Sequence, residues 1–218
     1  MSIKSKEEIQ LSDALFENIV KTLFIQGDLT IADFEDKKSL YKKVLKINEK
    51  VNYKIVIDHK TNIIETAREF LSRKNYNYAK LLYATYFEHE INDLILELSQ
   101  IKGLDKKTIN EIIKSVNIIA KYSWLITILG APKFSENHKK IIQKVSEERN
   151  AFVHYKYNPV EESNENIKDS NRKQDRITEE FKKIESTITY LKRFKSRILY
   201  KGHKQLIEKS IKTKPNQL

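Results

Sequence analysis

Hydrophobic residues recur at spacings of three and four along most of this chain, which is the pattern of one buried face of an α-helix. Such runs cover residues 8–25 and 31–47. Gly27 follows the first run and Thr30 precedes the second, and these residue types commonly end and begin helices. The later predicted helices cover residues 61–71, 78–98, 109–128, 135–155 and 177–199. The pattern therefore predicts an all-α helical bundle.

Two stretches do not fit this helical pattern. Residues 51–57 are rich in β-branched and aromatic side chains and are typical of one short strand. The pattern predicts no partner strand, so this run is alternatively an extended connector, half of a strand pair across a dimer, or a helix. Residues 161–176 contain one apolar side chain. They predict a mobile loop, because so little apolar area cannot offset the entropy lost on ordering.

These breaks divide the chain into three expected parts. We expect an N-terminal helical extension at residues 1–57, a helical domain at residues 58–211 and a disordered tail at residues 212–218. The total of 218 residues is enough to bury one core with an extension. With only four glycines and three prolines, the chain favours long helices over sheets with tight turns.

Composition limits the chemistry and the compartment. The chain has no cysteine, which excludes disulfides, thiolate metal sites and a cysteine nucleophile. It also has no uninterrupted apolar run near the roughly 20 residues of a membrane helix, and its first residues lack the apolar core of a signal peptide. We therefore expect a cytoplasmic protein that has no membrane partner.

Positive charge is in excess. Lysine and arginine total 41 against 30 acidic residues, which gives a formal net charge of +11. Such an excess favours binding to a phosphate backbone. A lysine-rich, solvated surface without a partner explains the same number equally well.

The candidate chemistry lies in one segment, residues 147–155, at the end of a predicted helix. It carries Arg149, Asn150 and His154 with apolar residues between them. Cleavage of RNA by its own 2′-hydroxyl requires proton transfer and stabilisation of charge on phosphorus. Histidine, with an ordinary pKa of about 6.5, suits the proton transfer, and the arginine fork suits two phosphate oxygens. The amide of Asn150 suits a phosphate oxygen or the orientation of His154.

The spacing of Arg149 and His154 raises a geometric problem. Five residues turn a regular helix by about 500°, which leaves the two side chains roughly 140° apart. One ideal helix would therefore not direct both at one phosphate. Distortion near Pro159, or the length of the side chains, would reduce the separation. In a purely structural interpretation, Arg149 forms a surface ion pair and His154 caps helix carbonyls.

Residues 149–154, RNAFVH, are similar to the Arg-polar-three-to-five-His signature of HEPN domains. Residues 67–92 resemble the family's first helix pair, in which a tight turn leads into a long helix with an acidic position midway. The resemblance covers roughly residues 61–200. It implies a metal-independent endoribonuclease whose two protomers bring their motifs into one cleft. It also implies a bacterial toxin or phage-defence setting, with an antitoxin or defence-system protein as a further partner.

The predicted catalytic residues are therefore Arg149, Asn150 and His154, and no metal or cofactor is expected because no carboxylates lie nearby at metal-binding spacing. Substrate-binding residues are predicted from the neighbourhood of the motif and from the apolar stripe of the long helix. Some HEPN members carry a modifiable tyrosine two places after the histidine, where this chain has a lysine. We predict substrate binding by Glu90, Tyr155, Lys156 and Tyr157, and core positions for Tyr83, Tyr86 and Trp124.

Two other functions stay open at this point. The same fold would serve as a non-catalytic module that binds RNA or a protein partner through its charged surface. A DNA-binding regulator is a weaker alternative, because no helix-turn-helix with a basic recognition helix is evident.

Overall fold

A computed structural model describes residues 6–48, 59–154 and 167–212, and every regular element in these ranges is helical. The all-α prediction is therefore confirmed for this part of the chain. Contacts divide the chain into two compact units, Met1–Val56 with Lys195–Leu218, and Ile57–Phe194. Residues 51–57, the β-like run, lie outside the described residues, as does all but residue 212 of the predicted tail.

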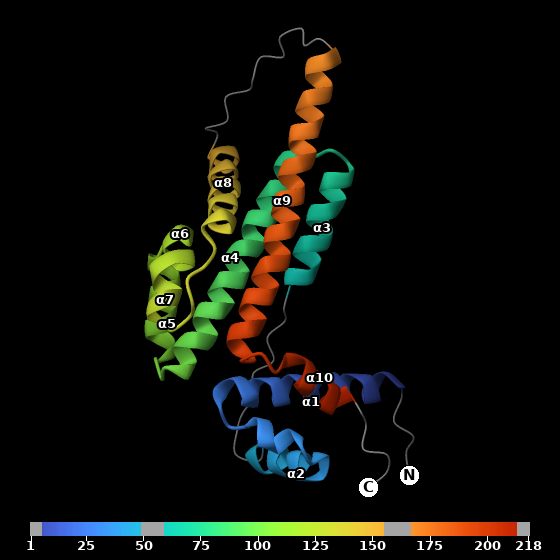
Figure 1. Cartoon of the computed structure of the whole chain (residues 1–218), viewed down its shortest axis with the longest axis vertical. Helices are drawn as coiled ribbons and strands as arrows, with labels where there is room; N and C mark the ends of the chain where they lie inside the picture. The colour runs from blue at the N-terminus through green and yellow to red at the C-terminus, as the bar shows by residue number, and fades with distance from the viewer. Residues whose placement is uncertain (1–5, 49–58, 155–166, 213–218) are drawn as a thin grey trace. The chain divides into compact units, whose positions relative to one another are not determined.

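The smaller unit is held together by one apolar cluster. Phe24 of the first helix meets Phe34 edge to face, with ring centroids 5.8 Å apart. Val20, Leu40 and Ile207 are almost fully buried in the same cluster. The unit contains α1 (Lys6–Gln26), a 3₁₀ turn η1 (Ile31–Phe34), α2 (Lys37–Asn48) and α10 (Lys204–Lys212), all labelled in Figure 1 except η1.

The predicted helix over residues 31–47 is in fact two elements. Thr30 donates from its backbone N–H to the Asp33 carboxylate at 2.7 Å, which fixes the short turn η1. Asp36 then accepts from the backbone N–H of Lys38 at 3.1 Å and so starts α2. Residues 195–211 also differ from the expected domain division, because the burial of Ile207 places α10 in the smaller unit.

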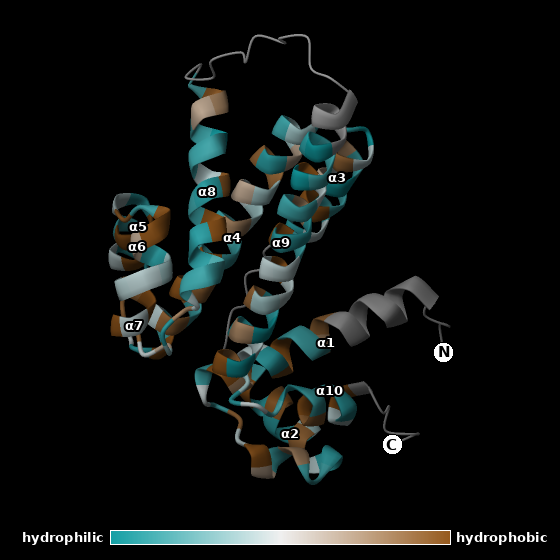
Figure 2. Ribbon diagram, turned by 45° about the horizontal axis from the view of Figure 1, so that its top comes forward, coloured by the Kyte–Doolittle hydropathy of each residue, from teal (hydrophilic) through white to brown (hydrophobic). Residues whose placement is uncertain are grey.

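The larger unit is built around the long helix α4 (Tyr76–Ile101). In Figure 1, α4 lies between α8 (Glu136–Val153) on one side and α3 (Lys60–Ser72) with α9 (Ile167–Leu199) on the other. Because α4 has neighbours on several sides, it is buried on more than one face, and the sides of α8 and α9 that Figure 2 turns to the viewer are largely hydrophilic. The fully buried residues of α4 include Tyr83, Tyr86, Phe87, Ile91, Leu94 and Ile95.

The predicted helix over residues 109–128 is interrupted. Asp105 caps α5 (Lys106–Ser115) by accepting from the backbone N–H groups of Lys107 and Thr108, at 2.9 and 3.1 Å. Asn117 breaks the run and caps a new turn through the N–H of Ala120 at 2.9 Å. The chain then continues through α6 (Ile118–Ala120), a π-helical turn η2 (Lys121–Leu125) and α7 (Ile126–Ile128). The π turn changes the facing of its side chains, and Trp124 is 51% exposed, so its predicted core position was wrong.

The start of α9 also differs from what the sequence predicts. Residues 167–176, predicted as part of a mobile loop, are helical, whereas residues 161–166 lie outside the described residues. Side-chain contacts give this polar helix tertiary support: Gln174 bonds to the Tyr76 hydroxyl at 3.1–3.2 Å, and Phe181 lies 5.8 Å from the Tyr76 ring. In the described part of the chain, no helix combines the length and apolar character of a membrane span.

Candidate functional site

Helix α8 brings the predicted catalytic residues to its C-terminal end. The helix ends at Val153, and His154 follows as its C-cap with φ −98° and ψ 21°. The backbone N–H of His154 still donates to the carbonyl of Asn150 at 3.0 Å, so helical bonding fixes the spacing of the motif. The imidazole of His154 is exposed at this end.

Arg149 is directed at the neighbouring helix α4. Its Nη2 lies 3.3 Å from Oε2 of Glu88, and its side chain is 29% exposed. The Nε atom is buried and has no hydrogen-bond partner among the described residues. A distance of 3.3 Å is long for a bond between two charged groups, so the described residues engage only part of the guanidinium's donor capacity.

Asn150 and His154 lie on a different side of α8 from Arg149. The two are four positions apart, which places them on the same face of a helix, and both are exposed. Arg149 precedes Asn150 by one residue and contacts α4 instead. The separation expected from the sequence is therefore present in the single chain.

Two sets of contacts hold the end of α8 against its neighbours. Lys80 of α4 lies 2.6 Å from Glu148 and 3.0 Å from Glu180, and Lys144 lies 2.8 Å from Glu180. Burial alone would raise the pKa of Glu180. Hydrogen bonds from Lys144 and Lys80 lower it by more, so the net shift is downward. These charges join α4, α8 and α9 directly beside Arg149.

Aromatic rings provide the second set of contacts. Phe152, two residues before His154, meets Tyr78 at the start of α4 edge to face, with centroids 5.5 Å apart. Tyr78 in turn stacks on Phe70 of α3 at 5.4 Å. The rings therefore connect the motif with the turn between α3 and α4.

Glu90 is buried as the apolar stripe indicated, with 7% of its surface exposed, but it does not face the motif. It lies 3.9 Å from Lys60 and lines a small cavity with Arg68 and Lys192. The acid that meets Arg149 is Glu88, two residues earlier and on another face of α4. Because the stripe marks the apolar core, it could not identify an acid at the interface with α8.

Sequence reasoning also missed Lys121, which is only 2% exposed on the π turn. Its Nζ donates to Oδ1 of Asn92 at 2.8 Å. Burial lowers the pKa of Lys121, and the nearby carboxylate of Glu88 partly opposes this shift. The available signal was the spacing of Glu88 and Asn92, two polar residues four positions apart and therefore on the same face of the helix.

The remaining predicted residues, Tyr155, Lys156 and Tyr157, lie outside the described residues. Within the ranges that the structure describes, His, Asp and Glu side chains form no group of three suited to a metal ion. Comparison with protein-family models, curated proteins and solved structures finds no match to this chain.

Proposed function

We propose that this protein is a metal-independent endoribonuclease that cleaves RNA by attack of the 2′-hydroxyl on the adjacent phosphodiester. The observation that carries the proposal is the end of α8, where an exposed histidine follows an arginine that is anchored yet incompletely bonded. An exposed imidazole is accessible to a polymer, and the anchored guanidinium offers N–H donors to its phosphate.

Each residue of the motif has a role in this mechanism. His154 takes the proton from the 2′-hydroxyl or gives one to the leaving 5′-oxygen. Asn150, on the same face, orients the imidazole or binds a phosphate oxygen. Arg149 binds the phosphate and stabilises its developing charge, with Glu88 holding the guanidinium in place. Lys121, buried beside Glu88, adds positive potential to this region.

The mechanism requires two copies of the chain. Arg149 faces α4 while His154 and Asn150 face solvent, so one chain divides the catalytic groups between two directions. A two-fold dimer would place the same helix end from both copies face to face and bring one copy's imidazole to the other's guanidinium. We therefore include a homodimer in the proposal.

The biological setting follows from the HEPN-like motif alone. A toxin or phage-defence ribonuclease would act on RNA in the cytoplasm and would be restrained by an antitoxin or triggered by a defence-system protein. The positive charge of the chain supports RNA as the substrate, because phosphate neutralisation supplies affinity without sequence preference.

Cleavage of labelled RNA by purified protein tests the proposal. Wild type, Arg149→Ala and His154→Ala are compared with His59→Ala and Arg193→Ala, which remove exposed side chains of the same types elsewhere. We expect only the first two substitutions to abolish cleavage, activity in EDTA, and products ending in a 2′,3′-cyclic phosphate. If Arg149→Ala and His154→Ala cleave RNA as fast as wild type, the assigned catalytic roles are refuted.

The same experiment separates the non-catalytic alternative. A module that only binds RNA would retain the labelled substrate intact while shifting its mobility. Loss of all activity in EDTA would instead indicate a metal enzyme.

A further inference from the structure

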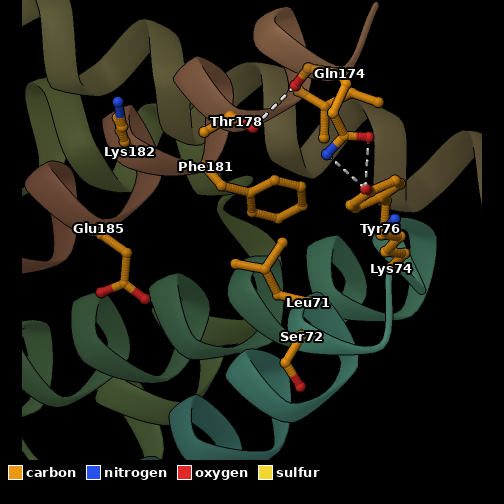
Figure 3. A pocket seen from close by; sticks show the side chains of 10 residues that line it. Leu71, Ser72, Lys74, Tyr76, Gln174, Thr178, Phe181, Lys182 and Glu185 are labelled. Atoms are coloured by element: carbon orange, nitrogen blue, oxygen red, sulfur yellow. Dashed lines mark hydrogen bonds between the residues drawn. The ribbon is translucent and has the colours of Figure 1, made fainter. Parts of the chain in front are cut away.

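A cavity of about 520 Å³ lies where the turn between α3 and α4 meets α9 (Figure 3). Its volume falls in the range of roughly 300–1,000 Å³ that is usual for small-molecule sites. Leu71, Ile177 and Phe181 supply apolar walls, and the partly buried ring of Tyr76 lies beside them. The amide of Gln174 is bonded to the Tyr76 hydroxyl at the edge of the cavity.

Two lysines border this apolar space. In Figure 3, Lys74 and Lys182 lie on opposite sides of the Phe181 ring, and both side chains are exposed. Among the described lining residues the one carboxylate, Glu185, is bonded to Arg68 through both oxygens at 2.9 and 2.8 Å. The Arg68 guanidinium lowers the pKa of Glu185, so this acid is a neutralised pair and the lysines set the charge of the rim.

Ring contacts link the turn that borders the cavity with the end of α8. Tyr76 opens α4, and Tyr78, two residues later, contacts both Phe70 and Phe152. His154 follows Phe152 by two residues. The cavity and the motif are therefore at the same end of the α3–α4–α8–α9 bundle, as Figure 1 also shows.

We propose that this cavity binds an unpaired base of single-stranded RNA, with the phosphates on either side of that base held by Lys74 and Lys182. An aromatic ring beside an apolar wall accepts a base by stacking, and a side-chain amide bonds to base edges. A nucleotide within a strand has one phosphate on each side, which matches two cations that flank one aromatic wall. The inference rests on the proposed function and adds to it an unpaired substrate and a base subsite near the cleavage motif.

Matched substitutions can remove the two cations. Lys74 has φ +60° and Lys201, in the smaller unit, has φ +49°. Glycine adopts this left-handed backbone readily, so the two substitutions have the same backbone effect. The test variant is Lys74→Gly with Lys182→Ala. The control is Lys201→Gly with Lys114→Ala, which removes two exposed lysines that do not line the cavity.

A second pair of variants tests the apolar space. Thr178 and Thr189 are exposed on α9, and each hydroxyl donates to a carbonyl four residues earlier. Only Thr178 lines the cavity. Thr178→Trp therefore fills the space without changing charge, while Thr189→Trp adds the same bulk elsewhere on the helix.

The probe is a short fluorescein-labelled 2′-O-methyl oligoribonucleotide of mixed sequence, which lacks the nucleophile and cannot be cleaved. Anisotropy titrations should show binding weakened about tenfold or more in both cavity variants and little changed in both controls. The lysine variant should also reduce the salt dependence of binding, by about 0.7 in the log–log slope for each lost phosphate contact. A duplex of the same sequence should bind independently of Thr178→Trp.

The outcomes separate this inference from the proposed function. Equal oligonucleotide affinity of the cavity and control variants overturns the base subsite, even if the protein cleaves RNA. Selective loss of affinity in the cavity variants of a protein that never cleaves RNA supports the base subsite and overturns the ribonuclease. Circular dichroism melting of each variant shows that a loss of binding does not come from unfolding.

Discussion

Two arginines of the larger unit are bonded in opposite ways. Arg68 places Nε and Nη2 on the two oxygens of Glu185 at 2.9 and 2.8 Å, and the Tyr83 hydroxyl donates to the same carboxylate at 2.7 Å. Among the described residues, Arg149 forms one ion pair, 3.3 Å from Glu88, and its buried Nε has no hydrogen-bond partner. The first arginine is engaged by the fold, whereas the second keeps a donor without a partner in the part of the chain that the structure describes.

Two histidines differ in the same way. His138 places Nδ1 2.9 Å from the Thr187 hydroxyl and stacks on Tyr190 at 4.2 Å, and burial lowers its pKa. Because the Thr187 hydroxyl donates to the Lys183 carbonyl, it accepts from Nδ1, so the neutral ring of His138 carries its proton on Nδ1. His154 instead ends a helix with its ring exposed. Residue type alone therefore does not separate these histidines, whereas their bonding and exposure do.

The largest expected effect is the difference between Arg149→Lys and Arg68→Lys. Arg149→Lys keeps the charge but loses the planar fork, and we expect RNA cleavage to fall about 10²–10³-fold with little change in stability. Arg68→Lys should leave the cleavage rate unchanged and lower the free energy of unfolding. Cleavage assays and urea denaturation of both variants measure the contrast, and equal effects on cleavage would remove the distinction between the two arginines.

Glu185→Ala should cause the largest loss of stability, about 1–3 kcal/mol. The fully buried Tyr83 would lose the acceptor of its hydroxyl, while the half-exposed Arg68 regains water. Burial and the bond to Glu185 both raise the pKa of Tyr83. Urea denaturation should show a smaller loss for Glu185→Gln, which retains an acceptor; an equal loss would assign the effect to the Arg68 pair instead.

Lys80→Met should have a smaller effect, about 1 kcal/mol. It keeps the apolar stem beside Phe181 but leaves Glu148 and Glu180 with Lys144 as their remaining cation in this network. The same measurement on Lys144→Met and on the double variant gives the coupling between the two lysines. Strictly additive losses would show that the four charges do not act as a network.

The smallest expected effect is a pH dependence from His138. Its pKa in the folded protein lies below the ordinary 6.5, so the unfolded chain binds the proton first as pH falls. The contribution to stability is complete above about pH 6.5 and declines from there toward the lowered pKa. Urea denaturation across this range should show a weaker decline for His138→Gln than for wild type. The exposed His89→Gln serves as the control, and an unchanged profile in His138→Gln would exclude this histidine as the cause.

Local sequence signals located the helix ends well. Gly27 directly follows α1 with φ +89°, and Thr30 is the N-cap of η1, because capping and left-handed turns depend on a few neighbouring residues. The same signals did not predict that the helix over residues 109–128 is interrupted at Asn117, since the hydrophobic pattern continues through it. Polar residues 167–176 were misassigned because their helix depends on contacts with α4 that are distant in sequence.

The sequence alone determined that the chain is helical and that an arginine, an amide and a histidine occur together near a helix end. It determined this because helical periodicity and capping are local properties of the chain. Only the tertiary structure decided that Arg149 meets Glu88 rather than Glu90, that Lys121 is buried and bonded to Asn92, and that a cavity forms between α9 and the turn joining α3 and α4. Those outcomes depend on which faces of separate helices pack together, and the spacing of residues along one helix does not contain that information.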